Sequence, residues 1–322
     1  MKRTFAFFAG CIILGFGCSK NVDNEITSSP EALTAPNSAR QCASHEVLEE
    51  QLRQDPARAA RMQEIERVID NEQRNPTTGR LVNGFYELPV VVNVLYKTTA
   101  ENISTAQIQS QIDVLNKDFS ATNSDYSKAP AEFATLRSGD TKIKFVLQGI
   151  VRKATNKPSW TTNDAMKKSS QGGISPTSPT TVLNMWSCNM GGGILGYAQF
   201  PGGNSATDGI VCDNNAFGIT SGVYGAGRTA THEVGHWLNL RHIWGDATCG
   251  NDLVTDTPVA QTSNGGCPTY PKVSSCSGKA EMTMNYMDYT YDACMYMFTI
   301  GQKSRMVATF AAGGGRNSFA QP

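Results

Sequence analysis

The sequence predicts an α/β protein with a twisted mixed sheet, a loop-rich C-terminal half and a helical segment ahead of both. Three observations predict this class. Short valine-rich or alternating stretches are typical of strands, and two longer stretches repeat apolar residues at helical spacing. The 30 glycines of the 322-residue chain indicate many turns. The length fits one large domain behind an N-terminal extension.

The first part of the extension, residues 1–18, resembles an export signal and is excluded from the fold. Lys2 and Arg3 precede an apolar run over residues 5–17, which is too short to cross a bilayer as a permanent helix. The run ends at Cys18, as in a bacterial lipoprotein signal. Two outcomes stay open, namely a lipid anchor on Cys18 or a simple secretory signal that is removed with its cysteine.

Residues 19–79 are expected to form a flexible tether followed by a helical pro-segment. Asp55 and Pro56 have the chemistry of a helix N-terminus. The apolar residues that follow on one helical face are Met62, Ile65 and Ile69. At the other end of the chain, residues 312–322 are expected to form a disordered C-terminal tail.

The large domain, residues 80–311, opens with a valine-rich strand over residues 88–96. A helix is expected over residues 104–119, where Ser104 and Gln107 form a capping box and apolar residues repeat at helical spacing. Further short strands are expected at residues 143–147, 182–186, 197–200 and 209–212, and a further helix at residues 228–240.

The last of these helices carries closely spaced histidines. His232 and His236 are four residues apart, so they lie on one face of a helix and can reach one metal ion. Glu233 can reach a water bound to that metal. His242 lies six residues further on, so the helix must end before it. We expect the end at Asn239, because asparagine tolerates the left-handed conformation.

Three neutral imidazoles around zinc leave a fourth position open for water, which is typical of a catalytic site. Zinc lowers the pKa of that water and polarises a substrate carbonyl, and Glu233 would be the general base without binding the metal. The alternative is a chance H-E-x-x-H motif on an ordinary buried helix. The third, correctly spaced histidine disfavours this alternative.

The histidines and Glu233 match the metzincin zinc signature, with Asn239 in place of its glycine. A methionine that matches the Met-turn of that signature follows at Met287. With both motifs, the chain resembles the pappalysin family of metzincin metallopeptidases over about residues 80–310. The resembling segments are LGYAQFP (195–201), HEVGHWLNLRHIWGD (232–246), DTP (256–258) and NYMDYTYDACMYMF (285–298).

The resemblance implies a metzincin-like catalytic domain with an active-site helix. By resemblance, the three histidines bind zinc and Glu233 is the general base. Met287 packs as an apolar floor under the metal. Tyr289 lies beside the metal, where its phenol can hydrogen-bond the tetrahedral intermediate. The strand around Tyr197 is the sheet edge along which an extended substrate would pair.

The resemblance also implies calcium near residues 251–257. Asp252, Asp256 and Thr257 are the candidate ligands, since they offer the oxygen atoms that hard cations prefer. The spacing is not that of an EF-hand, and from the sequence alone a solvated loop is an equal alternative. Asp292 is implied at the base of a pocket for a basic residue just after the scissile bond. From spacing alone, an exposed aspartate fits equally well.

Cys42 lies in the stretch RQCAS (residues 40–44), which resembles the cysteine switch of pappalysin-like pro-segments. A thiolate is a strong zinc ligand and would displace the catalytic water. The alternative is a free or intermolecularly paired cysteine. Activation would require cutting the pro-segment away. The turn-rich stretch 75–80 offers the bond between Gly79 and Arg80 for autolysis.

Six cysteines lie in the large domain once Cys42 and the two cysteines of the signal are set aside (9 − 3 = 6). An even number in an exported protein indicates disulfides, but the sequence alone cannot choose their pairing. A zinc site built from these cysteines is disfavoured, because the sequence contains no C-x-x-C pair. The resemblance favours Cys249–Cys276 and Cys267–Cys294, which leaves Cys188–Cys212 by elimination.

The charge balance excludes some partners. With 28 basic and 28 acidic residues, nothing favours nucleic acid or an anionic membrane, and a membrane is expected only through an N-terminal lipid anchor. The prediction is a zinc metalloendopeptidase acting on proteins or peptides, made as a zymogen and secreted or held at the cell surface of a bacterium. The alternatives are a catalytically silent zinc-bound adhesion or binding domain and a zinc hydrolase for a non-peptide amide.

Overall fold

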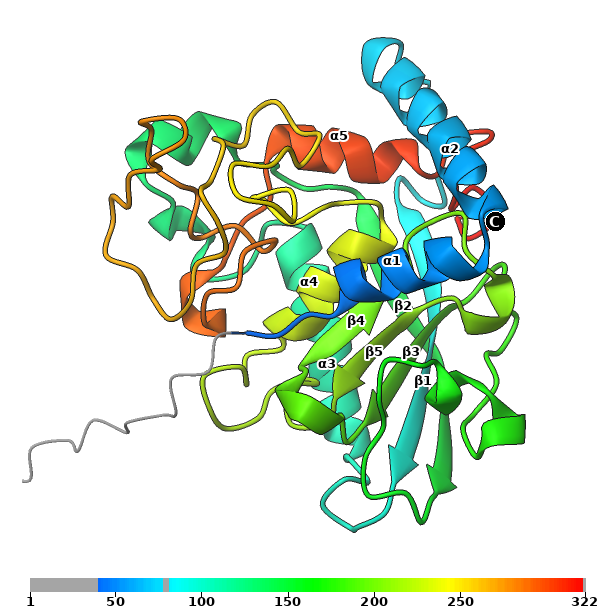
Figure 1. Ribbon diagram of the computed structural model, residues 1–322. Helices are drawn as coiled ribbons and strands as arrows, with labels where there is room; N and C mark the ends of the chain where they lie inside the picture. Colours follow the sequence, from blue (N-terminus) through cyan, green and yellow to red (C-terminus); the bar gives the residue numbers. More distant parts are fainter. Residues whose placement is uncertain (1–39, 78–80, 321–322) are drawn as a thin grey trace, which may run out of the picture. The chain divides into compact units, whose positions relative to one another are not determined.

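The structure is a computed structural model that describes residues 40–77 and 81–320 (Figure 1). The export signal, the tether and the bond between Gly79 and Arg80 lie outside the described residues. In the part that is described, no helix is both long enough and apolar enough to cross a membrane.

The centre of the fold is a five-stranded sheet in the order β2-β1-β3-β5-β4. Its strands are β1 (Tyr86–Tyr96), β2 (Ile143–Ala154), β3 (Leu183–Cys188), β4 (Gly196–Ala198) and β5 (Ile210–Asp213). Four strands are parallel, and the edge strand β4 runs antiparallel to β5. The predicted mixed sheet and α/β class are therefore confirmed.

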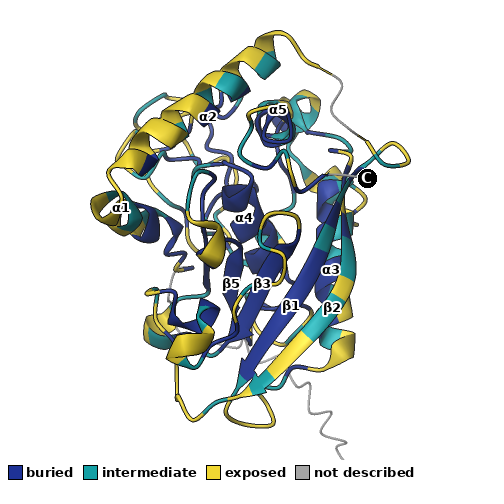
Figure 2. Ribbon diagram, turned by 90° about the vertical axis from the view of Figure 1, so that its right-hand side faces the viewer, coloured by how far each residue is buried: buried dark blue, intermediate teal, exposed yellow. Residues whose placement is uncertain are grey.

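The helices are α1 (Ser44–Gln54), α2 (Ala57–Arg74), α3 (Thr105–Phe119), α4 (Arg228–Trp237) and α5 (Ile300–Ala308). Apolar residues of α3 and α4 share one core with β1. Figure 2 shows the inner strands and α4 buried, while α1 and α2 keep an exposed outer face. Half of the expected capping box forms, because Ser104 accepts the N–H of Gln107 while the Gln107 side chain donates to Phe217 O.

The N-terminal segment packs against the large domain along both of its helices. The sequence reasoning missed α1, in which Val47 and Leu48 are buried. The predicted helix α2 begins at Ala57, and its Ile65 and Ile69 form a small apolar cluster with Ala308 of α5. The N-terminal segment is thus folded and packed on the surface of the large domain.

The C-terminal tail is packed up to residue 320, which corrects the expectation of disorder. Phe319 is buried against Trp237. Arg316 donates to Trp237 O and to Gln199 O at 2.9 Å each, and it pairs with Asp208 at 2.8 Å. These contacts anchor a stretch whose glycine-rich composition is typical of a flexible end.

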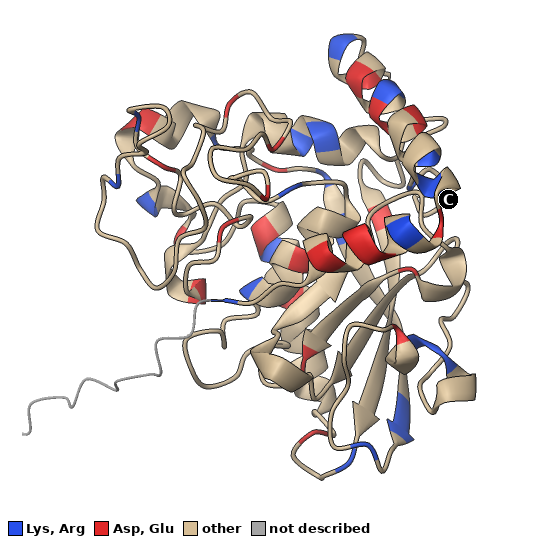
Figure 3. Cartoon of the chain, viewed as in Figure 1, with Lys and Arg blue, Asp and Glu red and all other residues tan. Residues whose placement is uncertain are grey.

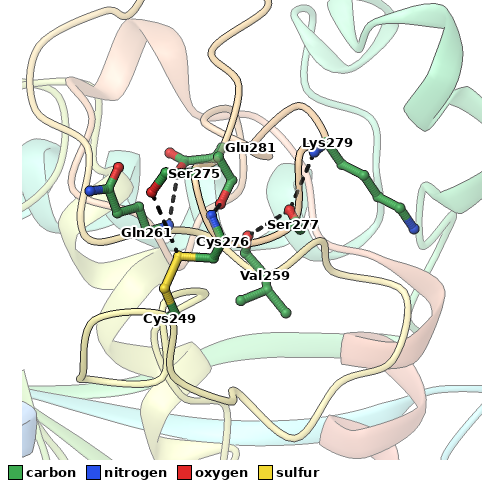
Figure 4. Close-up of a disulfide and its surroundings, with 9 residues drawn as sticks. Cys249, Val259, Gln261, Ser275, Cys276, Ser277, Lys279 and Glu281 are labelled. Atoms are coloured by element: carbon green, nitrogen blue, oxygen red, sulfur yellow. Dashed lines mark hydrogen bonds between the residues drawn. A yellow bond between two sulfur atoms is a disulfide. The ribbon is translucent and has the colours of Figure 1, made fainter.

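Two disulfides implied by the resemblance are present, Cys249–Cys276 and Cys267–Cys294. Figure 4 shows the first of them beside Gln261, whose carbonyl accepts the N–H of Cys249 at 3.1 Å. These bonds staple the long loop between α4 and the Met-turn.

The expected Cys188–Cys212 disulfide is wrong, since both thiols are free and buried. The register of β3 and β5 aligns Ser187 with Cys212 and Cys188 with Asp213. Because side chains alternate between the faces of a sheet, this offset of one residue places the two thiols on opposite faces. Each thiol accordingly belongs to a different apolar cluster.

Candidate metal centre

The helix α4 is fixed at both ends. At its start, Asp292 Oδ2 accepts the N–H groups of Ala226 (2.9 Å) and Arg228 (3.1 Å). A carboxylate in this position complements the positive end of the helix dipole. At its end, Asn239 takes the predicted left-handed conformation with φ 71°. The chain reverses there, which brings His242 back to the helix.

The reversal gathers three histidine Nε2 atoms. The distances are 3.1 Å from His236 to His232, 3.1 Å from His236 to His242 and 3.2 Å from His232 to His242. Zn–N bonds of about 2.0–2.1 Å in a tetrahedron would separate ligand atoms by roughly 3.3 Å. The observed spacing therefore fits one zinc ion bound by all three imidazoles.

The outer ring nitrogens set the tautomer that a metal requires. The Nδ1 atoms of His232 and His236 lie 2.7 Å from the carbonyl oxygens of Tyr286 and Leu240, and Nδ1 of His242 contacts the Asp246 carboxylate. Each Nδ1 therefore carries the proton, and the three Nε2 lone pairs face one another. Three lone pairs with no hydrogen atom between them repel one another, and a cation bound among them removes that repulsion.

Burial keeps the imidazoles of His232 and His236 neutral. It lowers the pKa of His236 to about 3, with His242 adding a smaller effect in the same direction. Burial also lowers the pKa of His232 well below its usual value. Neutral imidazole is the form that binds metal, so these two histidines can bind an ion at physiological pH.

The N-terminal segment reaches the same centre. Cys42 is buried, and its Sγ lies with the three histidine ligand atoms in a group whose members are all within 4.8 Å of one another. Among the described residues, this is the group of three or more His, Cys, Asp or Glu side chains that could hold a metal ion. Burial and then the charge of Glu233 raise the pKa of the free Cys42 thiol.

Glu233 also meets the N-terminal segment. Its Oε2 accepts the hydroxyl of Ser44 at 2.8 Å and lies 3.4 Å from Cys42 Sγ. Burial raises the pKa of Glu233 to about 7, although the hydrogen bond from Ser44 opposes that rise. A carboxyl group with a pKa near neutrality suits proton transfer. Gly196 of β4 leaves room for it, since a Cβ there would lie 3.0 Å from Glu233 Cγ.

The Met-turn closes the centre from below. Met287 is fully buried, and a Cβ on Gly235 would lie 2.4 Å from its Sδ. A larger residue at position 235 would therefore force the Met287 side chain to move. Tyr289 faces the centre from the side, and its hydroxyl donates to Cys42 O at 3.0 Å. Burial raises the pKa of Tyr289, so its phenol stays protonated.

Asp292 is paired with Arg40 of the N-terminal segment. The two side chains form a fully buried ion pair through Asp292 Oδ1. Arg40 Nη1 also donates to Thr229 Oγ1 at 2.9 Å, and its guanidinium lies 5.0 Å from the centroid of the Tyr224 ring. Asp292 is thus buried beside the centre, not exposed on the surface.

The two aspartates predicted for calcium accept hydrogen bonds from neighbouring groups. Asp256 uses both carboxylate oxygens at the start of α5, where they accept from Thr299 Oγ1 and Gly301 N. Asp252 accepts from Thr257 Oγ1 at 2.7 Å, and burial raises its pKa to about 6.

Four residues of the centre were missed in the sequence. Arg40 and Ser44 were read only as neighbours of Cys42, and Asp246 only as the end of a resembling segment. Gly235 was passed over inside the zinc motif. The spacing of His242 and Asp246, one helical turn apart in number, was the signal for a carboxylate that orients a ligand.

Comparisons with known proteins agree with this centre. A family model described as pregnancy-associated plasma protein-A matches residues 193–311. An extracellular metalloprotease of Verticillium alfalfae is 32% identical over 236 residues, which are 68% of this chain and 77% of the relative.

Two solved structures from Tannerella forsythia are also similar. A promirolysin mutant has a TM-score of 0.77 and 39% identity, covering 88% of this chain and 100% of that one. Mature mirolysin in complex with a cleaved peptide has a TM-score of 0.70 and 42% identity, covering 77% of this chain and 100% of that one.

Proposed function

The chain belongs to the pappalysin family of metzincin zinc metallopeptidases, the family of pregnancy-associated plasma protein-A, and we propose that it is a secreted endopeptidase that cleaves before basic residues and is held latent by its N-terminal segment. One observation carries the proposal. A single stretch of the segment pairs Arg40 with Asp292 and brings Cys42 to the three histidines. Secretion is supported by the names of its extracellular relatives.

His232, His236 and His242 would hold the zinc ion. When bound, zinc supplies a Lewis acid that activates water and polarises the substrate carbonyl. Glu233 accepts the proton of the attacking water at its carboxylate and passes it to the leaving amine. Tyr289 donates its phenolic hydrogen to the oxygen that gains charge. Its present bond to the main-chain carbonyl of Cys42 supports that role.

Latency would rest on two side chains that block two different parts of the machinery. Cys42 offers a thiolate as fourth ligand and so excludes the catalytic water. The Ser44 hydroxyl donates a hydrogen bond to the general base Glu233. The same hydroxyl accepts the N–H of Ala198 in the edge strand at 2.8 Å. An extended substrate would need that same N–H.

The direction of the segment explains why it is not a substrate. A basic residue after the scissile bond would fill the Asp292 pocket, and the residue before it would present its carbonyl to the metal. In the segment, Cys42 at the metal follows Arg40 instead of preceding it. The segment therefore crosses the cleft in the opposite direction to such a substrate, and it pairs in parallel with β4 at Gly196.

The pocket favours arginine over lysine after the cut. Thr229 and Asp292 accept from two different nitrogens of the Arg40 guanidinium. The planar guanidinium satisfies two acceptors at fixed positions, whereas the ammonium of lysine is a point charge.

Two further proposals concern calcium and a lipid anchor. Calcium in the loop around Asp252, Asp256 and Thr257 would raise the melting temperature of the zinc-loaded protein. A lipid anchor on Cys18 concerns residues outside those described. A silent binding domain is disfavoured because Glu233 lies beside the metal centre with its pKa raised.

Removing the metal tests the proposed function. A chelator should abolish cleavage of a peptide with arginine after the scissile bond, and added zinc should restore it. The far-UV circular dichroism spectrum should not change, since the two disulfides and the core hold the fold. Cleavage that persists in the metal-free protein would contradict a zinc mechanism.

Releasing the two blocking side chains tests latency. In the uncut chain, Cys42→Ala should raise peptidase activity at least tenfold, since thiolate–zinc bonds are strong. Cys42→Ala combined with Ser44→Ala should raise it further, because the base and the edge strand are freed as well. Cys188→Ala is the matched control, as that thiol is equally buried but lies away from the centre. Equal activity of all three variants and the uncut parent would refute the switch.

A further inference from the structure

A second anchor of the N-terminal segment lies on α2. Arg305 Nη2 donates to both carboxylate oxygens of Glu66, at 2.6 and 2.7 Å. The Asn239 amide also donates to Glu66, at 3.1 Å. Arg305 is only 1% exposed, and its Nε donates to Asn239 O at 2.9 Å. The large domain thus holds a guanidinium and an amide that both point at one carboxylate.

Loss of the segment would leave these donors without an acceptor. Within the described part of the chain, Glu66 is the acidic side chain that forms an ion pair with Arg305. Asp252 lies close enough to influence Arg305 electrostatically. Its oxygens, however, accept from Val254 N and Thr257 Oγ1. A guanidinium forms strong bidentate hydrogen bonds with a carboxylate, so the vacated site favours another carboxylate.

The site opens toward the metal centre. A cavity of about 500 Å³ lies between α1, α2 and the large domain, and Glu66, Phe200, Arg241 and Asp246 are among its lining residues. Asp246 contacts the zinc-ligand candidate His242. Figure 3 shows acidic residues along α1 as well, the helix that leads from the metal centre to α2. The cavity therefore extends from Glu66 to the carboxylate that contacts His242.

We propose that Arg305 and Asn239 form a carboxylate-binding site of the mature enzyme, which takes an acidic side chain of the substrate N-terminal to the scissile bond. The proposal rests on the proposed function. That function places a basic residue in the Arg40 pocket, so the opposite side of the metal receives the residues before the cut. Glu66 occupies the site in the latent chain as a stand-in for such a residue.

Peptide binding tests the site without relying on activity. The probe is a labelled peptide of residues 57–74, which lacks Arg40 and Cys42, titrated into the processed protein by fluorescence anisotropy. The parent peptide should bind about tenfold more tightly than its Glu66→Gln version, since hydrogen bonds to a charged group are strong. A Glu64→Gln peptide is the control, because that side chain is exposed and pairs with Arg67.

The difference between the Glu66 peptides should vanish in an Arg305→Gln protein. If that variant does not fold, Asn239→Gly removes one donor and keeps the left-handed backbone, and it should shrink the difference. Equal binding of the parent and Glu66→Gln peptides would overturn the site.

Substrate selection tests whether an acidic side chain of the substrate binds at Arg305 and Asn239. In peptides with arginine after the cut, a single glutamate is moved through the preceding positions and compared with glutamine. One position should show about a tenfold higher kcat/KM for glutamate, and Arg305→Gln should remove that preference. A flat profile together with tight peptide binding would overturn the substrate role. Absence of any cleavage would instead count against the proposed function, while the binding result would still decide the site.

Discussion

Replacing Glu233 by glutamine should lower kcat/KM of the processed enzyme by about 10²–10⁴-fold, the usual contribution of general acid–base catalysis. Glutamine keeps the size of the side chain but cannot accept the proton of the attacking water. The measurement is the initial rate of cleavage of a fluorogenic peptide with arginine after the scissile bond, at zinc saturation.

Zinc content and a control variant show whether the loss of rate comes from the Glu233 carboxylate itself. Zinc content should stay at the parental value, because the ligand atoms come from the three histidines. A Glu87→Gln variant, whose side chain pairs with Lys144 on the sheet surface, should keep full activity. If Glu233→Gln retained more than a tenth of the parental rate, the proton would have to be transferred by another group.

Replacing Asp292 by asparagine should lower kcat/KM for arginine after the cut by about 10²–10³-fold. Truncating one partner of a buried, hydrogen-bonded charge pair costs roughly 2–5 kcal/mol, and each 1.36 kcal/mol is tenfold in rate. Cleavage before leucine, which forms no ion pair, should change much less. The informative quantity is therefore the ratio of the two kcat/KM values.

The same substitution should weaken latency, because Arg40 uses the same carboxylate. Asp292 also accepts two N–H groups at the start of α4, so a general loss of stability must be separated from a loss of specificity. Asp213→Asn is a suitable control. That buried carboxylate accepts the N–H groups of Met190 and Asn215, and it has no arginine partner among the described ion pairs. An unchanged arginine-to-leucine ratio in Asp292→Asn would remove Asp292 from the pocket.

Local patterns were enough for part of this molecule. The helices α3 and α4 could be predicted because apolar periodicity and histidine spacing are properties of neighbouring residues. The end of α4 at Asn239 followed from the reach of His242 and from backbone sterics. The capping box of α5, formed by Thr299 and Gln302, carried an equally local signal that was overlooked.

The remaining features depend on contacts between distant parts of the chain. Elimination paired Cys188 with Cys212, but strand register decides which face a thiol occupies, and register is a property of two strands. Arg305 meets Glu66 across 239 positions, so neither residue indicates the other. The buried tail shows the same limit, since Arg316 meets Gln199, just after β4, and Trp237 of α4 only after the fold has formed.

The contacts of the N-terminal segment also determine how an activating cut would act. Arg40, Cys42, Ser44 and Glu66 all precede the bond between Gly79 and Arg80. A cut at that bond would leave every one of them on a single fragment, still seated on the large domain. The covalent tie would become a bimolecular equilibrium, and the active fraction would then depend on total concentration. Dilution after export would favour the active enzyme, and a high concentration of the two fragments would favour the latent complex.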